Sequence, residues 1–335
     1  MANIGKSLMG WVDARFPATE TYEYHMSKYY APKNFNFWYF FGVLSMIVLV
    51  NQLVTGIWLT MSYNPSGEGA FDSIEYIMRD VEYGWLLRYM HSTGASAFFV
   101  VVYLHMFRGL LYGSYKKPRE LVWLFGMAIY LALMAEGFFG YLLPWGNMSY
   151  WGAQVILNLA GAVPVVGEEL VTWVRGDYLI SGITLNRFFA LHVVAIPLVL
   201  VALVFMHLVA LHHVGSNNPD GVDIKKVKDE NGIPLDGVPF HPYYTVHDLV
   251  GIVVFLAAFS AVLFFFPDGG GYFLERPNFE PANPLKTPEH IAPVWYYTPY
   301  YAILRAVPSK LGGVIAMGAA IAILFVLPWL DKSPV

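Results

Sequence analysis

Residues 84–111 read GWLLRYMHSTGASAFFVVVYLHMFRGLL, and this stretch decides the fold. It is apolar enough, and long enough as a helix, to cross the roughly 30 Å hydrocarbon core of a bilayer. His91 and His105 lie fourteen residues apart within it, which is about 21 Å along a helix. Ionisable residues inside a membrane span are rare and usually functional. The stretch therefore predicts a transmembrane helix that holds two histidines at two depths.

The composition of the whole chain agrees with a membrane location. Of its 335 residues, 57% are hydrophobic and only 13% are charged, whereas a soluble domain has about 25% charged residues. The net charge of −4 gives no reason to expect a nucleic acid as partner. The chain has no cysteine, which excludes disulfides, iron–sulfur ligation and covalent c-type heme. A metal must therefore be bound by histidine, carboxylate or methionine.

Six apolar stretches predict an all-α integral membrane protein. Residues 152–174 are also fairly apolar, but Glu168 and Glu169 would be costly in lipid, so two short interfacial helices are expected there instead of a seventh span. Lysine and arginine are concentrated in the N-terminal tail and after the second and fourth spans, which predicts a cytoplasmic N-terminus. The six predicted spans are 37–61, 85–111, 121–143, 186–211, 246–266 and 311–330.

The fourth span carries a second pair of histidines, His192 and His207, fifteen residues apart. At 100° per residue, fourteen steps end within about 40° of the starting direction and fifteen within about 60°. Because the second and fourth spans run parallel, His91 is expected to face His192, and His105 to face His207. Two imidazoles fill both axial positions of a heme iron, which suits electron transfer. The histidines therefore predict two stacked hemes; the alternatives are hydrogen-bonded polar residues or a proton path through a transporter.

Paired glycines repeat the fourteen-residue interval on the first and third spans. They are Gly42 with Gly56 and Gly126 with Gly140. A position without a side chain lets a flat macrocycle approach the backbone, although small residues also serve close helix packing. The repeat favours two planar cofactors at two depths.

Arg88 and Arg108 each lie three residues from a histidine of the second span. Each arginine is expected to pair with a heme propionate through charge-assisted hydrogen bonds. The alternative is that both side chains extend to lipid headgroups.

Several longer motifs are specific enough to identify a family. They are GWLLRYMH (84–91) with GAS (94–96), RGLLYGSY (108–115), GYLLPWG (140–146) with WGA (151–153), GSNNP (215–219), HPYY (241–244) and AILR (302–305). These motifs resemble the cytochrome b subunit of the bacterial cytochrome bc1 complex, a ubiquinol:cytochrome c oxidoreductase. The resemblance runs from about residue 35 to the end of the chain.

The resemblance implies a catalytic subunit of a respiratory translocase in the bacterial inner membrane. It implies two noncovalent hemes b, a low-potential outer one between His91 and His192 and a high-potential inner one between His105 and His207. A quinol, expected to be ubiquinol, would be oxidised near the outer face and a quinone reduced near the inner face. The implied partners are a Rieske iron–sulfur protein, cytochrome c1, membrane lipid and a second copy of the complex as a homodimer.

The resemblance also implies the quinone sites. The family motif Pro-Glu-Trp-Tyr has Val294 in place of its glutamate here, and valine cannot accept a proton. Glu289 and His290 are nearby titratable candidates for that role, unless they are solvated loop residues. The implied outer-site residues are Gly152, Tyr296 and Tyr301, and the implied inner-site residues are His212, Ser216, His247 and Asp248.

Histidine and aspartate are suitable proton donors to a reduced quinone, because both can be tuned to titrate near neutrality. The inner-site residues can instead be polar residues at helix ends. A diheme anchor without an outer quinol site is a further alternative, against which WGA (151–153) and residues 293–301 argue.

Two features depart from the family pattern. The fifteen-residue interval between His192 and His207 also occurs in split photosynthetic relatives, but their chain ends after the fourth span. Fused relatives have eight spans, two more than are visible here. The expected division is an N-terminal cytoplasmic or interfacial segment (1–36), a heme-binding core (37–213) with an interfacial loop (152–175), a cytoplasmic loop (214–245) and a C-terminal membrane region (246–335) with a quinol-site loop (267–310).

Overall fold

The computed structural model describes residues 2–334, with side chains from residue 7 onward. Met1 and Val335, at the ends of the predicted segments 1–36 and 246–335, lie outside the described residues. The predicted all-α fold with six spans is confirmed. The observed helix ends differ most from the predicted ends at the fourth and fifth spans. Within residues 2–334, six helices are long and apolar enough to cross a membrane: Phe37–Thr60, Gly84–Leu111, Glu120–Leu142, Gly182–Val214, Phe240–Phe265 and Lys310–Leu330.

The first four spans form two tightly packed helix pairs. Helix α3 (Phe40–Thr60) packs along α5 (Gly84–Leu111), and α6 (Glu120–Leu142) packs along α10 (Ile196–Val214). The pairs face each other across two internal cavities, one above the other, and Leu49 and Phe98 line both cavities. The bundle therefore encloses two cavities (compartments) that are separated by an apolar partition, which includes Leu49 and Phe98.

The fourth span is not a uniform α-helix. It consists of α9 (Gly182–Ala190), the π-helix η3 (Leu191–Ala195) and α10. Pro197 has no backbone N–H, so it cannot donate to the carbonyl of Val193 as an α-helix requires. A π-turn absorbs one extra residue in a helix. The fifteen-residue interval between the two histidines of this span is thereby accommodated.

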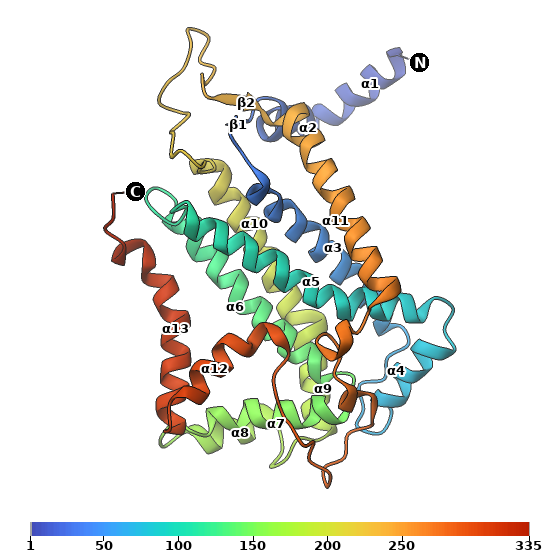
Figure 1. The fold of residues 1–335 in the computed structure, drawn as a ribbon. Coiled ribbons are helices and arrows are strands. Elements are labelled where there is room, and N and C mark those ends of the chain that lie inside the picture. Colours follow the sequence, from blue (N-terminus) through green and yellow to red (C-terminus); the bar gives the residue numbers. More distant parts are fainter. Residues whose placement is uncertain (1, 335) are drawn as a thin grey trace.

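Residues 152–174 form parts of two short helices. These are α7 (Asn147–Ala160) and α8 (Gly167–Arg175), which lie across the end of the bundle opposite the N-terminus (Figure 1). The guanidinium of Arg175 donates to Asn158 Oδ1 at 2.7 Å and fastens α8 to α7. The predicted helix pair is present, and its interfacial position stays a prediction.

The N-terminal segment is attached to the other end of the bundle. After α1 (Ala2–Asp13) and α2 (Ala18–Tyr22) come the π-helix η1 (Glu23–Ser27) and strand β1 (Tyr30–Pro32). Strand β1 pairs antiparallel with β2 (Gly237–Pro239), with Ala31 opposite Val238. The π-helix η4 (Phe240–Tyr244) follows β2 and packs against η1. This pairing holds η1 next to the ends of the fourth and fifth spans.

The remaining elements cover the bundle from outside. Helix α4 (Ala70–Arg79) connects the first two spans, and α11 (Thr245–Phe265) packs on α3 and α5. A long loop with the 3-10 turns η5 (Gly269–Gly271), η6 (Arg276–Phe279) and η7 (Trp295–Tyr297) leads to α12 (Thr298–Ala306) and α13 (Lys310–Leu330). Near residue 146 the loop returns to the bundle, where Gly146 and Pro281 form a β-bridge and Asn147 donates to the Lys286 carbonyl at 3.1 Å.

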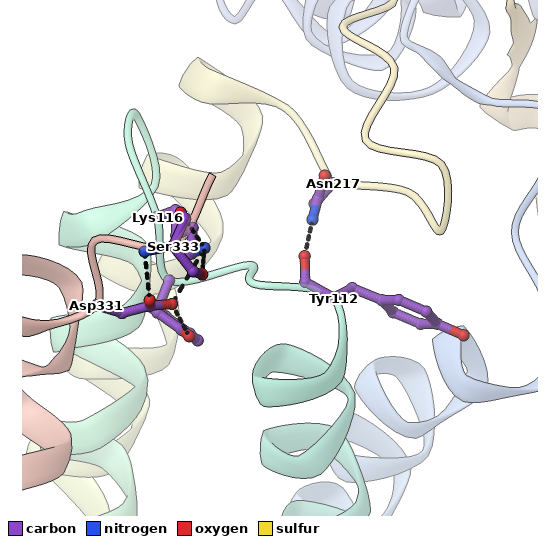
Figure 2. A network of polar contacts seen from close by, with 6 residues as sticks. Tyr112, Lys116, Asn217, Asp331 and Ser333 are labelled. Atoms are coloured by element: carbon purple, nitrogen blue, oxygen red, sulfur yellow. Dashed lines mark hydrogen bonds and ion pairs between the residues drawn. The ribbon is translucent and has the colours of Figure 1, made fainter. Parts of the chain in front are cut away.

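A polar network fixes the end of α13 to the loop between α5 and α6 (Figure 2). Tyr115 Oη donates to Asp331 Oδ2 at 2.6 Å, and Lys116 Nζ lies 3.1 Å from the same oxygen and 2.7 Å from Ser333 Oγ. The hydrogen bond from Tyr115, followed by those from Ser333 and Lys116, holds the pKa of Asp331 below its usual range. Asn217 Nδ2 donates to the Tyr112 carbonyl at 2.6 Å and ties the segment after α10 to the same loop (Figure 2).

Candidate functional site

The four membrane histidines form two ring pairs. The centroids of His91 and His192 are 6.0 Å apart, and those of His105 and His207 are 6.3 Å apart. Two imidazoles that bind one metal atom from opposite sides have centroids about 6 Å apart, because each metal–nitrogen bond is about 2 Å long. The predicted pairing of the rings is confirmed, and their role as iron ligands stays a prediction.

The rings of His91 and His192, called the outer ring pair, have polar hydrogen-bonding partners. His91 Nδ1 lies 2.9 Å from Thr55 Oγ1, and His192 Nδ1 lies 3.0 Å from both the carbonyl oxygen and Oε1 of Glu136. A histidine that donates from Nδ1 keeps its lone pair on Nε2, the arrangement that metal ligands use. Thr55 and Glu136 are thus positioned to orient both rings, and the sequence analysis did not identify either residue.

The inner ring pair differs in this respect. His105 Nδ1 is buried and has no hydrogen-bond partner among the described residues. A buried polar atom without a partner is costly, so His105 lacks the orienting contact that Thr55 and Glu136 give the rings of the outer pair.

All four predicted glycines lie directly against these rings. A Cβ atom at Gly56 would lie 3.1 Å from His91 Cε1, and one at Gly140 would lie 2.4 Å from His192 Cε1. At the inner level, Cβ atoms at Gly42 and Gly126 would each lie 3.4 Å from Cε1 of His105 and His207, respectively. The glycines therefore keep space around each ring pair, as a planar ligand requires.

Arg88 lines the cavity that contains His91 and His192, called the outer cavity here. Arg108 lines the cavity that contains His105 and His207, called the inner cavity. Neither forms an ion pair with a carboxylate in the part of the chain that the structure describes. Arg108 Nε is buried without a hydrogen bond, and its guanidinium lies 4.8 Å from the centroid of the Tyr39 ring. A buried cation that lacks an anionic partner suits a ligand with carboxylates.

These observations fit a heme in each compartment. The outer cavity has a volume of about 440 Å³ and the inner one about 390 Å³. Ring spacing, glycine clearance and unpaired arginines agree with the same ligand at both levels. No group of three or more His, Cys, Asp or Glu residues capable of holding a metal ion occurs in residues 2–334.

The predicted outer-site residues are only partly brought together. Tyr296 lines the outer cavity, is 5% exposed and stacks on Phe99 with centroids 3.9 Å apart. Gly152 and Tyr301 do not line this cavity. Gly152 lies against Tyr141, since a Cβ atom there would be 3.5 Å from the Tyr141 ring.

Val294 is buried in the outer cavity wall, whereas Glu289 and His290 are exposed. Besides Glu136, which lines this cavity, a second carboxylate lies next to its wall: Glu275, which contacts the lining residue Tyr141 and which the sequence analysis did not identify. Its Oε2 accepts a hydrogen bond of 2.8 Å from Tyr141 Oη. Burial raises the pKa of Glu275, and burial followed by the nearby Glu275 charge raises the pKa of Tyr296. Sequence pattern had no signal for Glu275, because a glutamate in a polar loop looks solvated.

The predicted inner-site residues are gathered in one place. The inner cavity is lined by His212 at the end of α10, by Ser216 just after it, and by His247 and Asp248 in the first turn of α11. Stacked aromatic rings hold both histidines: Tyr29 lies 4.6 Å from His212 and Phe40 lies 4.8 Å from His247, centroid to centroid.

Further residues at the inner cavity were not predicted from the sequence. Tyr29 and Arg119 line it, and Arg119 Nε donates to the Gly215 carbonyl at 2.8 Å. His25 reaches the lining residue His212, with the two Nδ1 atoms 3.0 Å apart. The cue for His25 was present in the sequence, as a histidine in the basic N-terminal tail, but nothing local linked it to residue 212.

Comparison with known proteins agrees with this geometry. The family description Cytochrome b/b6/petB matches residues 26–215, and Cytochrome b(C-terminal)/b6/petD matches residues 281–335. Cytochrome b of Allochromatium vinosum is 66% identical over 98% of the chain and 81% of its own length, and that of Rhodospirillum rubrum is 54% identical over 97% and 78%. A solved structure titled "Hyperthermophilic respiratory Complex III" superposes with a TM-score of 0.89 and 42% identity, covering 97% of this chain and 84% of the other.

The fold and the paired histidines define a helical membrane cytochrome of electron transport. The chain belongs to the cytochrome b family, and its similarity is to the cytochrome b that forms the core subunit of respiratory complex III, a bc1-type oxidoreductase. As a member it is a multi-pass membrane protein, binds heme b and has its partners within that complex.

Proposed function

We propose that the chain conducts electrons from a quinol-oxidation site near the outer face, through two hemes b, to a quinone-reduction site near the inner face. His91 with His192 and His105 with His207 would each hold one heme iron, and iron held by two imidazoles suits electron transfer. This Q-cycle function would contribute to the proton gradient of a respiratory chain. The quinone is expected to be ubiquinone.

The observation that carries the proposal is the presence of one histidine pair in each of two adjoining cavities. Each cavity holds one pair of histidines, the glycines opposite them and one arginine. The outer cavity continues to Val294 and Tyr296 of the long loop, and the inner one continues to the ends of α10 and α11. An electron path between two quinone sites requires this order of compartments.

At the inner end, the chain's own residues would position and protonate a quinone. His212 and Asp248 are the proton donors, since quinone reduction takes up two protons, and both line the cavity. Ser216 and His247 are available to hydrogen-bond the quinone carbonyls.

At the outer end, the apolar wall that includes Val294 and Tyr296 would exclude water from the quinol. Gly152 would keep the adjoining surface open next to Tyr141, and Tyr301 would act from α12 outside the cavity. The proposal includes a Rieske iron–sulfur protein and cytochrome c1 as electron acceptors, and a homodimeric complex. It places the chain in a bacterial inner membrane with a cytoplasmic N-terminus.

The test is a count of hemes and of redox steps. The complex is purified in mild detergent, and reduced-minus-oxidised spectra are recorded during a potentiometric titration, followed by heme extraction. Two noncovalent hemes b per chain with two separate potentials are expected. One heme, or none in a folded complex, would contradict the proposal.

A further inference from the structure

The inner cavity is joined to the surface by a pair of histidines from distant parts of the chain. His25 lies in η1, and His212 lies 187 positions later at the end of α10. Their Nδ1 atoms are 3.0 Å apart and their ring centroids 5.0 Å apart. The centroid distance exceeds the nitrogen distance by only 2.0 Å, so the two nitrogens lie between the ring centres. The rings meet head to head, in hydrogen-bond geometry.

The two rings differ in their surroundings. His25 is exposed, whereas His212 is partly buried and lines the inner cavity. Tyr29 stacks on His212 with an interplanar angle of 12°, and Tyr24 contacts His25 edge-on at 4.8 Å. The pairing of β1 with β2 holds this segment in place. One ring therefore faces water and the other faces the cavity, with a hydrogen bond between them.

We propose that His25 and His212 form a two-histidine relay that brings protons from the aqueous side to the inner cavity; this inference rests on the proposed quinone reduction there. When one Nδ1 donates and the other accepts, His25 carries the Nδ1 proton and His212 carries its proton on Nε2. His25 takes a proton from water at Nε2 as its Nδ1 proton passes to His212 Nδ1, and His212 gives its Nε2 proton to the reduced quinone in the same concerted movement, so both rings stay neutral. Each step moves one proton and no electrons.

The charged and titratable groups around the relay come from five segments of the chain. The Glu23–Lys28 ion pair and Tyr24 lie on the same segment as His25, and His241 of η4 contacts Tyr22 beside it. Arg119 lies near Tyr29 on the cavity side, and Lys225 Nζ donates to the carbonyl of His213 at 2.8 Å. Asp248 lines the same cavity as His212. Asp248 supplies the second proton that quinone reduction needs.

His25 acts through His212 and does not touch the quinone, so it is a positioning and relay residue. The test uses membranes that contain the assembled complex, and it measures oxidation of the inner heme by a short-chain ubiquinone across a range of pH. His25→Asn keeps an N–H donor near the Nδ1 position but cannot relay protons, and His25→Phe removes the hydrogen bond. His213→Asn, at the exposed neighbouring histidine, is the matched control.

Both His25 variants are expected to slow heme oxidation about tenfold at high pH, less than the hundredfold or more typical of a direct proton donor. The pH profile should change, the rate should fall further in D₂O, and imidazole should partly restore a His25→Gly variant. His213→Asn should match the parent, and heme content should be unchanged throughout.

Three outcomes distinguish the explanations. A parent complex whose inner heme is not oxidised by the quinone would overturn the proposed function itself. An active parent with a His25→Asn variant of unchanged rate and pH profile would overturn the relay alone. A uniformly slower His25→Asn variant, with unchanged pH dependence and no response to imidazole, would show that the pair only fastens the N-terminal segment, and that also overturns the relay.

Discussion

The two ends of the heme bundle are built in opposite ways. At the outer end the histidine rings have polar partners, Thr55 and Glu136, but only one of the three predicted quinol-site residues, Tyr296, lines the cavity. At the inner end His105 Nδ1 has no partner among the described residues, yet all four predicted quinone-site residues line one cavity. The inner site is built from helix ends that the spans already fix, whereas the outer site depends on the long loop after α11.

The largest expected effect comes from removing one ring of the outer pair. His192→Leu should leave one heme per chain, with the inner heme and its potential retained, because the apolar partition separates the compartments. Extracted heme and the redox titration measure this. The exposed His213→Leu is the control and should keep both hemes. Loss of both hemes from a folded His192→Leu protein would show that the two compartments are not independent.

Replacing glycines by alanine should show how much space separates the backbone from the histidine ring at each of the two heme levels. A methyl group at Gly140 would lie 2.4 Å from the His192 ring, but one at Gly42 would lie 3.4 Å from the His105 ring. Gly140→Ala should therefore cost about 1–3 kcal/mol through overpacking and lower outer-heme occupancy, whereas Gly42→Ala should have a smaller effect on the inner heme. Gly318→Ala, with nothing within 4 Å, is the control. Heme occupancy in equal preparations gives the ranking, and equal losses at both levels would refute it.

The polar support of the outer rings predicts a milder change. Thr55→Val keeps the shape of a side chain that is 1% exposed but removes the acceptor for His91 Nδ1–H. Loss of such a partner lowers metal-site affinity about tenfold or more, so the outer heme should dissociate faster and its potential should rise. A spectroscopic titration with excess apo-acceptor protein measures release. A change confined to the inner heme would contradict the assigned partner.

The smallest effect concerns pH. Burial raises the pKa of Glu275 above its ordinary value of 4.5, so above that pH the folded protein binds more protons at this site than the unfolded chain does. Stability from this group is therefore complete at lower pH and is lost as the pH rises through the raised pKa. Glu275→Gln should gain thermal stability relative to the parent as the pH increases, whereas exposed Glu289→Gln should not. Parallel melting curves at every pH would contradict the raised pKa.

Most of the fold could be predicted because its information is local. Hydropathy located the six spans, the parallel direction of the second and fourth spans paired His91 with His192, and the repeated glycine interval indicated the same two depths. Contacts between distant segments could not be predicted in this way. Glu275 lies beside Tyr141 because a loop folds back, and His25 reaches the cavity because β1 pairs with β2. Neither contact has a periodic signature.

The π-turn in the fourth span separates counting along the chain from position in space. Its five residues, Leu191–Ala195, include His192 and take up the one residue by which this helix exceeds the fourteen-residue interval of the second span. An extra residue here changes the sequence interval between His192 and His207, but His192 still faces His91. A search for diheme proteins that fixes the histidine interval would therefore reject chains of this geometry, whereas a search by matching depth in two parallel helices would retain them.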